Sequence, residues 1–339
     1  MKFLLTAINA KFIHSNPAIY SLRAGVGEKL QPYVELAEFT INESLESILE
    51  GIWKRQPKVI GFSCYIWNWK LIREILTELP KILPDTEIWL GGPEVTYDGP
   101  GLLREFPQVT GIMVGEGEVT FREVLEQYLR EAETAGQSEQ QPESDSTEHQ
   151  VADRRGTVAG KSMVERFGQI PGLCLASGYT APRDLTDLTT LPFLYEDMEP
   201  FTNRIIYYET SRGCPYRCSY CLSSIDKKVR LRDISVVKRE LQFFLDQNVK
   251  QVKFIDRTFN CDHKHAMEIW RYIYEHDNGV TNFHFEISAD ILREEEIALL
   301  NRFRPGLAQL EIGVQSTNPE TIRAIHRVMD VDKLEKIVA

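Results

Sequence analysis

Three cysteines lie close together in the stretch Thr210–Ser223, where Cys214, Cys218 and Cys221 form a Cys-x3-Cys-x2-Cys array. A strand-like run, Arg204–Glu209, leads into them, so the three thiols are predicted to lie on a loop at the carboxyl end of a strand. In barrels of alternating strands and helices, active sites gather at those ends. The array is therefore the first candidate for chemistry in this chain.

Closely spaced thiolates suit two kinds of metal site, iron–sulfur clusters and zinc. Structural zinc takes four protein ligands, and the candidates for a fourth ligand are Cys261, His263 and His265. Zinc ligands usually come as two separated pairs, a pattern that three cysteines in one short loop fit poorly. A [4Fe–4S] cluster usually takes four cysteines, so three leave one iron open to a non-protein ligand. The array favours a cluster, with zinc or an inert group of thiols as the alternatives.

The overall composition indicates a soluble globular protein of about two domains. The chain has 339 residues, of which 42% are apolar and 26% are charged. Its formal net charge of −11 argues against a general nucleic-acid binder, which usually has a basic face. The amino-terminal apolar run Phe3–Ile8 is too short for a secretion signal or a membrane span, so we expect a cytoplasmic protein without membrane contact. In that reducing compartment the six cysteines are not expected to form structural disulfides.

The first 131 residues alternate between strand and helix patterns, which predicts a parallel sheet with helices on both faces. We expect a flavodoxin-like, or Rossmann-like, α/β domain over residues 1–131. The predicted strands are Lys2–Asn9, Tyr33–Phe39, Val59–Cys64, Glu87–Leu90 and Gly111–Val114. Helices are predicted over Pro17–Leu30, from a cap at Asn42 to Gln56, over Lys70–Leu79 and over Thr120–Glu131. Pro80 is expected to end the third of these helices.

Small residues follow three of these strands, at the edge of the sheet where such domains bind ligands. They are Ser63 and Cys64, then Gly91 and Gly92, then Gly115, Glu116 and Gly117. Glycines at these positions let a bulky ligand approach the backbone closely. Ordinary turn glycines are the alternative for each segment by itself, but three such ends on one edge favour a ligand site.

The remaining chain is predicted to form three segments. Residues 132–165 are rich in Glu, Gln, Ser, Asp and Gly, a composition that predicts a disordered insertion. Residues 166–203 regain apolar residues and prolines, and we expect an ordered connector. Residues 204–339 resume the alternation of strands and helices in about four strand–helix units. The predicted strands are Arg204–Glu209, Gln251–Asp256, Phe283–Ser288 and Leu307–Gln315. The predicted helices are Ile234–Gln247, Lys264–Glu275, Leu292–Phe303 and Pro319–His326.

The cysteine array resembles the motif of the radical S-adenosylmethionine (radical SAM) enzymes, Cys-x3-Cys-x-aromatic-Cys. Tyr220 supplies the aromatic residue, and the lead-in Arg-Gly-Cys-Pro matches as well. The resemblance implies a [4Fe–4S] cluster on Cys214, Cys218 and Cys221, with S-adenosylmethionine (SAM) on the open iron. One electron, from a donor such as flavodoxin or ferredoxin, then cleaves SAM to methionine and a 5′-deoxyadenosyl radical that abstracts hydrogen from a substrate.

The same resemblance implies residues for SAM binding. Asp256 is the candidate for the SAM amino group, with a helix N-cap as its alternative role. Arg327 is the candidate for the SAM carboxylate, because a guanidinium pairs with a carboxylate through two hydrogen bonds; its alternative is a solvated arginine at a helix end. The further candidates are Tyr220, then Glu286 and Ser288 at the third strand end, and Gln315 and Ser316 near the ribose.

The amino-terminal half resembles the cobalamin-binding domain that is fused to many radical SAM enzymes. The segments Gly91–Glu94 and Gly115–Glu118 carry most of this resemblance, which implies that cobalamin lies on the edge formed by the strand ends. Many cobalamin proteins carry Asp-x-His-x-x-Gly after the first strand, whereas this chain has Asn9–Pro17 there. We therefore expect His14 and Asn16 to line the site without a histidine ligand to cobalt of that type.

The two resemblances together imply a cobalamin-dependent radical SAM enzyme acting on an unknown small-molecule or peptide substrate. The expected reaction is methyl transfer, or a radical cyclisation or rearrangement. A methylthiotransferase is an alternative, but such relatives carry three further cluster cysteines near the amino terminus, and here only Cys64 precedes residue 174. A non-catalytic corrinoid and iron–sulfur carrier, or a degenerate fragment, is the other alternative. Relatives have six strands in a partial (β/α) barrel, so the four units predict an incomplete, truncated barrel.

Overall fold

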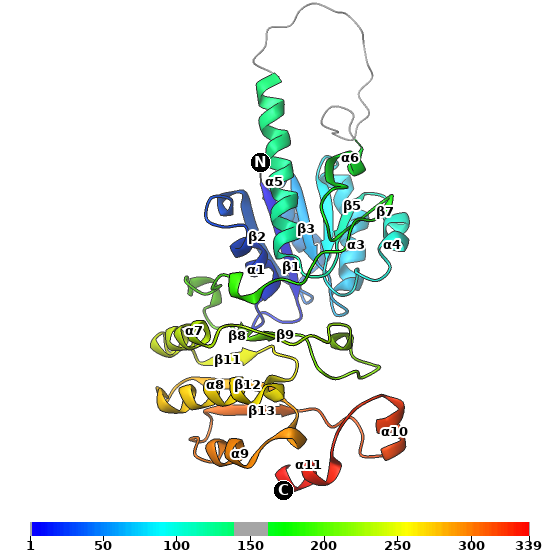
Figure 1. Ribbon diagram of the computed structural model, residues 1–339. Coiled ribbons are helices and arrows are strands. Elements are labelled where there is room, and N and C mark those ends of the chain that lie inside the picture. Colours follow the sequence, from blue (N-terminus) through cyan, green and yellow to red (C-terminus); the bar gives the residue numbers. More distant parts are fainter. Residues whose placement is uncertain (1, 139–161, 339) are drawn as a thin grey trace, which may run out of the picture. The chain divides into compact units, whose positions relative to one another are not determined.

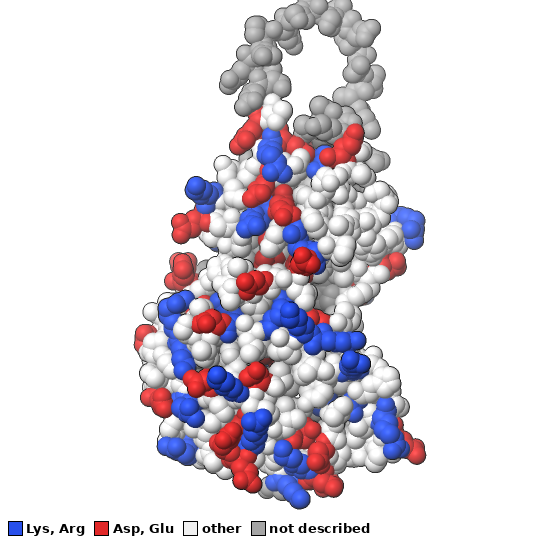
Figure 2. All heavy atoms as spheres, viewed as in Figure 1, with Lys and Arg blue, Asp and Glu red and all other residues white. Residues whose placement is uncertain are grey.

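The computed structural model describes residues 2–138 and 162–338 (Figure 1). The chain divides into two compact units. The first runs to Thr186 and includes Leu191–Asp197, and the second comprises Asp187–Thr190 and the chain from Met198 onward. Within the described residues, no helix is long and apolar enough to cross a membrane. Figure 2 shows a face on which basic and acidic side chains are interspersed.

The first unit is built on a seven-stranded sheet with the order β2-β1-β3-β4-β5-β6-β7. Five strands are parallel, as the alternating pattern predicted: β1 (Phe3–Asn9), β2 (Val34–Thr40), β3 (Val59–Ser63), β4 (Glu87–Gly91) and β5 (Val109–Met113). The segment predicted as a connector adds the antiparallel strands β6 (Leu173–Leu175) and β7 (Gly178–Tyr179). The predicted flavodoxin-like fold class is confirmed for this unit.

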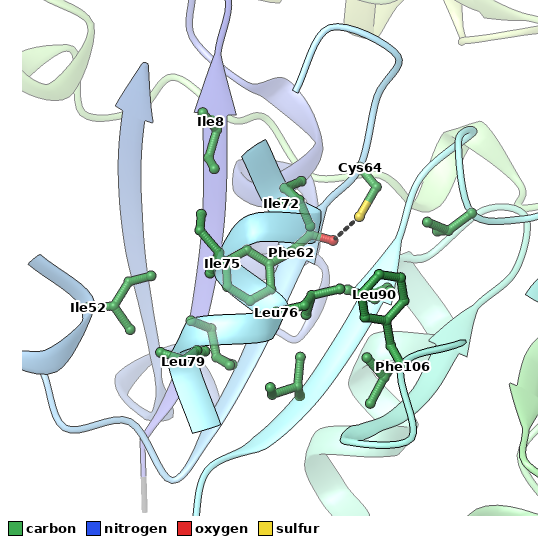
Figure 3. Packing of buried hydrophobic residues seen from close by; sticks show 14 of the residues in the cluster. Ile8, Ile52, Phe62, Cys64, Ile72, Ile75, Leu76, Leu79, Leu90 and Phe106 are labelled. Atoms are coloured by element: carbon green, nitrogen blue, oxygen red, sulfur yellow. Dashed lines mark hydrogen bonds between the residues drawn. The ribbon is translucent and has the colours of Figure 1, made fainter. Parts of the chain in front are cut away.

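Two hydrophobic clusters pack on the two faces of this sheet because successive strand residues point to opposite sides. In β1, Leu4 and Ile8 belong to one cluster and Phe3 and Leu5 to the other. The first cluster (Figure 3) includes side chains of α2 (Leu45–Trp53), α3 (Trp69–Ile82) and α4 (Gly99–Glu105). The second cluster includes side chains of α1 (Pro17–Gly25), α5 (Glu118–Ser138) and α6 (Met163–Phe167).

Two of the predicted helix ends differ from the structure for identifiable reasons, a distant contact in α3 and a local cap in α2. Helix α3 continues through Pro80 to Ile82. Proline lacks the N–H that would satisfy the Leu76 carbonyl one turn earlier, and Gln108 donates to that carbonyl instead, at 2.7 Å. Helix α2 is capped by Ser44 rather than Asn42, because the Ser44 hydroxyl accepts the Ser47 N–H at 3.2 Å.

The ends of the predicted disordered insertion are helical. Residues 132–138 continue α5, and α6 begins at Met163 behind a capping box formed by Ser162 and Glu165. Residues 139–161 lie outside the described residues. Helix α6 places Arg166 in the interior, where its guanidinium contacts Glu87 at 3.1 Å and Glu131 at 2.9 Å. This buried ion pair fixes α6 and α5 to β4.

The second unit contains a four-stranded parallel sheet with the order β13-β12-β11-β8. Its strands are β8 (Ile206–Tyr208), β11 (Gln251–Phe254), β12 (Asn282–Ile287) and β13 (Ala308–Ile312). Its helices are α7 (Ile234–Asp246), α8 (His263–Glu275), α9 (Glu294–Leu300), α10 (Pro319–Ala324) and α11 (Val331–Val338). Within the described part of the chain the strands form an open sheet, in agreement with the predicted incomplete barrel.

The two faces of this second sheet differ in chemistry. One face is apolar, and its Phe254 and Phe285 rings lie 4.5 Å apart and pack near Trp270 of α8 and Phe259. The residues that alternate with them, including Lys253 of β11, are only partly buried and mostly polar. The helices therefore stabilise one face, and the polar face remains available for chemistry.

Candidate active site

The cysteine loop of the second unit is closed at its base by a short antiparallel ladder. Strand β9 (Ser211–Arg212) pairs with β10 (Arg230–Leu231), which brings the two ends of the loop together. Asp226 reinforces the closure, because its carbonyl accepts the Cys214 N–H at 3.0 Å and its carboxylate accepts a hydrogen bond from Arg230 at 2.8 Å. The predicted loop at a strand end is thus a tethered loop rather than a free one.

Gly213 explains why the motif begins with Arg-Gly-Cys. Its φ of +93° lies in the region that favours glycine, and a Cβ atom there would approach the Lys228 carbonyl oxygen to 2.4 Å. Any other residue would push the two sides of the loop apart next to Cys214. The glycine thus lets the backbone of the loop close tightly beside the first cysteine.

The three cysteines lie on one loop and differ in exposure. Cys214 and Cys218 are buried and Cys221 is partly exposed. Among residues 2–138 and 162–338, no three His, Cys, Asp or Glu side chains form a group that could hold one metal ion. In a cubane cluster, each cysteine binds a different iron atom.

The candidates for a fourth zinc ligand lie in different surroundings. His263 pairs through Nδ1 with Glu296 at 2.9 Å, and His265 is buried in α8, where burial lowers its pKa. Burial also raises the pKa of Cys261 to about 11, and the nearby Cys214 and Asp256 add to the rise.

Thr258 is the polar neighbour of the first cysteine. Its hydroxyl oxygen lies 3.5 Å from the Cys214 sulfur, and the same hydroxyl reaches the Arg257 carbonyl at 2.8 Å. A hydroxyl hydrogen can rotate between such partners. When Cys214 is a thiolate it can only accept, so Thr258 is the group that can donate a hydrogen bond to it.

Asp256 lies at the end of β11 and is almost fully buried. Its carboxylate accepts hydrogen bonds from the Thr210 N–H at 3.1 Å, the Thr210 hydroxyl at 2.7 Å and the Ser211 hydroxyl. Burial raises the pKa of Asp256, and these hydrogen bonds oppose the rise. The alternative role of helix cap is wrong, because Asp262 caps α8 by accepting the His265 N–H at 2.9 Å. Asp256 instead holds the backbone that enters the cysteine loop.

Ser288 and Glu286, both predicted from the third strand end, point to different surroundings. The Ser288 hydroxyl donates to Asp290 at 2.7 Å and lies near the Tyr216 hydroxyl of the cysteine loop. Glu286 lies two residues earlier, on the polar face of β12, where it pairs with Lys253 at 3.5 Å. Ser288 is thus next to the cysteine loop, whereas Glu286 belongs to the open face of the sheet.

Arg327 joins the cysteine loop to the end of β13. Its guanidinium donates to the Tyr220 hydroxyl at 3.2 Å and to the Gly313 carbonyl. Arg327 is thus partly buried and hydrogen-bonded. Gln315 has a φ of +57°, and its side-chain amide lies next to Gly313. The Ser316 hydroxyl accepts a hydrogen bond from the Asn318 N–H at 3.1 Å. The residues predicted from the motif and from the fourth strand end thus gather in one place.

In the first unit, side chains tie together the strand ends that form the predicted ligand edge. Asn68 donates to the Ile8 carbonyl at 3.0 Å and to the Ser63 carbonyl at 2.9 Å. Asn16 donates to the Ser63 hydroxyl at 3.4 Å, and the His14 carbonyl accepts from Asn9 at 3.0 Å. His14, Asn16 and Ser63 are therefore held at one edge.

The small residues of this edge have different roles. Gly92 has a φ of +107° and packs against the Cys64 carbonyl, which a Cβ atom would approach to 2.5 Å. The backbone therefore requires glycine at this position. Gly115 has a φ of +80° and nothing within 4 Å of its Cβ position, which leaves room for a ligand. Glu116 accepts the Thr186 N–H at 2.6 Å. Cys64 is fully buried in the core (Figure 3), so the prediction that it contacts cobalamin is wrong.

Exposed apolar side chains follow the same strand ends, and the sequence analysis missed them. Tyr65 and Trp67 stack with ring centroids 4.3 Å apart. We call the exposed members of this set the apolar edge: Phe12, Ile13, Ile66, Trp67 and Tyr97. Exposed apolar patches mark binding sites. The sequence signal was the apolar run Tyr65-Ile-Trp67 in a loop, where polar turn residues are expected.

Comparison with protein-family models places both units. Residues 4–125 match the model of the B12 binding domain, and residues 208–339 match the model of the radical SAM superfamily. The chain belongs to the radical SAM superfamily and carries a B12 binding domain. The cysteine loop thus lies in the radical SAM unit and the apolar edge in the B12-binding unit.

Individual proteins similar to this radical SAM chain are considerably longer. A 2-(S-pantetheinyl)-carbapenam-3-carboxylate methyltransferase of Streptantibioticus cattleyicolor is 28% identical over 228 residues, which cover 64% of this chain and 29% of that protein. The structure of the radical SAM methyltransferase TsrM from Kitasatospora setae matches with a TM-score of 0.68 and 17% identity, over 100% of this chain and 64% of that one. The structure of the cobalamin-dependent S-adenosylmethionine radical enzyme OxsB matches with a TM-score of 0.70 and 16% identity. This match covers 97% of this chain and 46% of the OxsB chain. This chain spans less than two thirds of each of them, and the two structural matches establish the fold.

Proposed function

We propose that this protein is a cobalamin-dependent radical SAM enzyme that cleaves SAM and transfers a methyl group to a small-molecule substrate. The observation that carries the proposal is the tethered loop with Cys214, Cys218 and Cys221 in a unit that matches the radical SAM model. Similarity to proteins named as methyltransferases favours methyl transfer over radical cyclisation or rearrangement.

Each unit has residues that fit one cofactor. When bound, a reduced [4Fe–4S] cluster supplies the electron that cleaves SAM, and cobalamin supplies a carrier for the methyl group. Cys214, Cys218 and Cys221 would hold the cluster. The residues that would position SAM are Tyr220, Asp256, Ser288, Gln315, Ser316 and Arg327, which the hydrogen bonds described above fix around the loop.

For cobalamin, the open space at Gly115 and the apolar edge are the supporting observations. A corrin ring is broad and largely apolar, so exposed aromatic side chains beside a parallel sheet edge offer it contact area. His14, Asn16, Ser63, Gly91 and Gly117 complete the proposed surroundings. Reduction of the [4Fe–4S] cluster for SAM cleavage requires an electron donor such as flavodoxin or ferredoxin. It also requires a reducing compartment, which agrees with the predicted cytoplasmic location.

The deciding experiment is anaerobic reconstitution of the full chain with iron, sulfide and cobalamin, followed by addition of SAM and a reductant. We expect 5′-deoxyadenosine or S-adenosylhomocysteine to form, quantified by mass spectrometry. A protein that holds both cofactors at full occupancy and forms neither product is a carrier, and the enzyme proposal then fails.

Replacement of Thr258 by valine is expected to lower the midpoint potential of the reconstituted cluster. A hydrogen bond to a cluster sulfur stabilises the reduced, more negative state, and valine keeps the shape of threonine without the donor. One such bond corresponds to a shift on the order of 50 mV for a one-electron couple. Redox titration followed by electron paramagnetic resonance measures it. Thr258→Ser, which keeps the hydroxyl, serves as the matched control, and an unchanged or raised potential in Thr258→Val contradicts the prediction.

Cobalamin bound to this protein is expected to have no histidine ligand on cobalt, because the loop from Asn9 to Pro17 lacks the usual motif. The reduced cofactor can be examined by electron paramagnetic resonance in protein labelled with 15N-histidine. We expect the same spectrum as with 14N-histidine, and the same spectrum again for His14→Ala. A change in the nitrogen splitting on labelling would identify a histidine ligand and overturn this prediction.

A further inference from the structure

The chain that follows the third cysteine exposes two apolar side chains. Leu222 and Ile225 are 50% and 60% exposed. They belong to one short turn, η5 (Leu222–Ser224), where the Ile225 N–H donates to the Leu222 carbonyl at 3.2 Å. Side chains three residues apart lie above one another in such a turn, so the two point to the same side of the loop. The loop thus presents an apolar pair to solvent next to Cys221, which is itself partly exposed.

Two lysines continue this surface along the chain. Lys227 and Lys228 are both exposed. The neighbouring Arg230 pairs with Asp226 at 2.8 Å, whereas neither lysine ammonium group pairs with a carboxylate in the described part of the chain. Asp226 is the single acidic residue of the segment 210–232. Its charge is balanced within the segment, and the two lysine charges remain available to a partner.

The charge of this surface is opposite to that of the whole chain. We call Leu222, Ile225, Lys227 and Lys228 the loop surface. Residues 210–232 contain six Lys or Arg side chains and one Asp, a net charge of +5, whereas the whole chain has a net charge of −11. In Figure 2, basic side chains gather over the part of the second unit that Figure 1 labels β9. A local excess of one charge attracts partners of the opposite charge, so the loop surface suits an acidic partner.

The loop surface is held in place by the backbone of the cysteine loop. The Asp226 carbonyl accepts the Cys214 N–H at 3.0 Å, and the Lys228 carbonyl lies against Gly213. These contacts fix the segment that carries the lysines before any partner arrives. A preformed surface of this kind avoids the entropic cost of ordering a loop on binding.

The combination of exposed apolar and basic side chains fits a protein better than a small anion or a nucleic acid. A phosphate group gains nothing from Leu222 and Ile225, whereas protein interfaces combine an apolar centre with a polar rim. Complexes between electron-transfer proteins have some of the smallest interfaces known. A surface confined to one loop is sufficient for a partner of that class.

We propose that the loop surface docks an acidic one-electron carrier protein. The proposal rests on the proposed function, in which a cluster on Cys214, Cys218 and Cys221 has to be reduced. Cys221 directly precedes η5, so a carrier on the loop surface lies beside a residue that would hold the cluster. One electron leaves the reduced carrier and enters the cluster, and no bond is made or broken.

The first test measures binding of an acidic flavodoxin, in its oxidised form, to the full reconstituted chain by isothermal titration calorimetry. We expect binding that weakens as salt is added, because salt screens exposed charges. Lys227→Glu and Lys228→Glu are each expected to weaken binding about fivefold at low salt. Lys250→Glu is the matched control, because this exposed lysine precedes β11 and lies at the opposite edge of the parallel sheet. The proposal fails if wild-type protein does not bind, or if all three variants bind like wild type.

The apolar pair distinguishes a protein partner from a polyanion. Leu222→Ser and Ile225→Ser are each expected to weaken flavodoxin binding about fivefold and to leave its salt dependence unchanged. Val280→Ser, at an apolar residue that is 51% exposed just before β12, is the matched control. A single-stranded oligonucleotide is the competing probe. If it binds as tightly as flavodoxin and serine at position 222 or 225 weakens neither ligand, the surface is a general polyanion site and the proposal is wrong.

The second test measures reduction of the reconstituted cluster by stopped flow in the absence of SAM. Reduced flavodoxin is compared with the methyl viologen radical, a small cation that requires no docking surface. Lys227→Glu and Lys228→Glu are expected to slow reduction by flavodoxin about fivefold and not to slow reduction by methyl viologen, which added negative charge attracts. Equal slowing with both reductants means that the cluster itself is disturbed, and unchanged rates with flavodoxin mean that it docks elsewhere. Either result overturns the proposal.

These measurements are independent of the SAM-cleavage experiment. A chain whose cluster is reduced through the loop surface but which forms no product from SAM loses the proposed function and keeps the docking surface. A chain that cleaves SAM with methyl viologen as reductant, and whose reduction by flavodoxin ignores both lysines, keeps the proposed function and loses the docking surface.

Discussion

Replacement of Cys218 by alanine is expected to abolish the cluster and, with it, all SAM cleavage. The variant keeps two of the three proposed iron ligands, and loss of a ligand exposes the cluster to solvent and to further loss of iron. Cys218 is a buried residue of this loop. Iron and sulfide content after anaerobic reconstitution, together with the visible absorbance, measures the effect. Full cluster content in Cys218→Ala would contradict the ligand assignment.

Cys261→Ala is the matched control for this prediction. Cys261 lies close enough to Cys214 for the two groups to interact electrostatically, yet it is not proposed as a ligand. We expect the variant to retain iron, sulfide and SAM cleavage. If Cys261→Ala lost the metal as Cys218→Ala does, and zinc replaced iron in the wild-type protein, a four-cysteine zinc site would be the correct assignment.

The parts of the fold that could be predicted from sequence are those with local causes. Strands β1 and β3 are buried at every position and mostly apolar, because both faces of the parallel sheet are covered. Such runs can be recognised without knowing their neighbours. The closing of the cysteine loop was only partly predictable. Gly213 is visible in the sequence, but its packing against Lys228 is not.

The error at Pro80 originates in a contact between distant residues, whereas the misplaced cap of α2 is a local error. Pro80 was predicted to stop a helix, and the side chain that compensates for it, Gln108, lies on another segment. Cys64 follows a strand, as edge residues do, but it is buried in the hydrophobic cluster on one face of the sheet. The pairs Asp256–Ser211 and Arg327–Tyr220 were equally invisible, although the residue types had been recognised. The residue types of the site are thus easier to predict from the sequence than the hydrogen-bond partners that position them.

Replacement of Arg166 by methionine is expected to destabilise the first unit by about 3–5 kcal/mol, as does breaking a buried salt bridge by removing one partner. The Arg166 side chain is 2% exposed and pairs with Glu87 and Glu131, whose side chains are 15% and 12% exposed. Methionine keeps contact with the Tyr128 and Phe167 rings on which the guanidinium lies, but it leaves two carboxylates without their cation. Native-state hydrogen exchange of the β4 amides measures the free energy of opening of this unit alone.

Two further variants separate a buried charge from a general loss of packing. Arg73→Met removes an arginine that pairs with Glu105 at the surface, where the two side chains are 41% and 45% exposed. This change is expected to lower the free energy of unfolding by less than about 1 kcal/mol. Adding Glu87→Gln and Glu131→Gln to Arg166→Met should recover part of the lost stability, because the buried carboxylates are then neutral amides. If the triple variant is no more stable than Arg166→Met, lost packing explains the effect and the charge argument is wrong. If stability is recovered, the ion pair is chiefly a device that places α6 on β4 and α5, since a neutral set of the same shape supports the unit nearly as well.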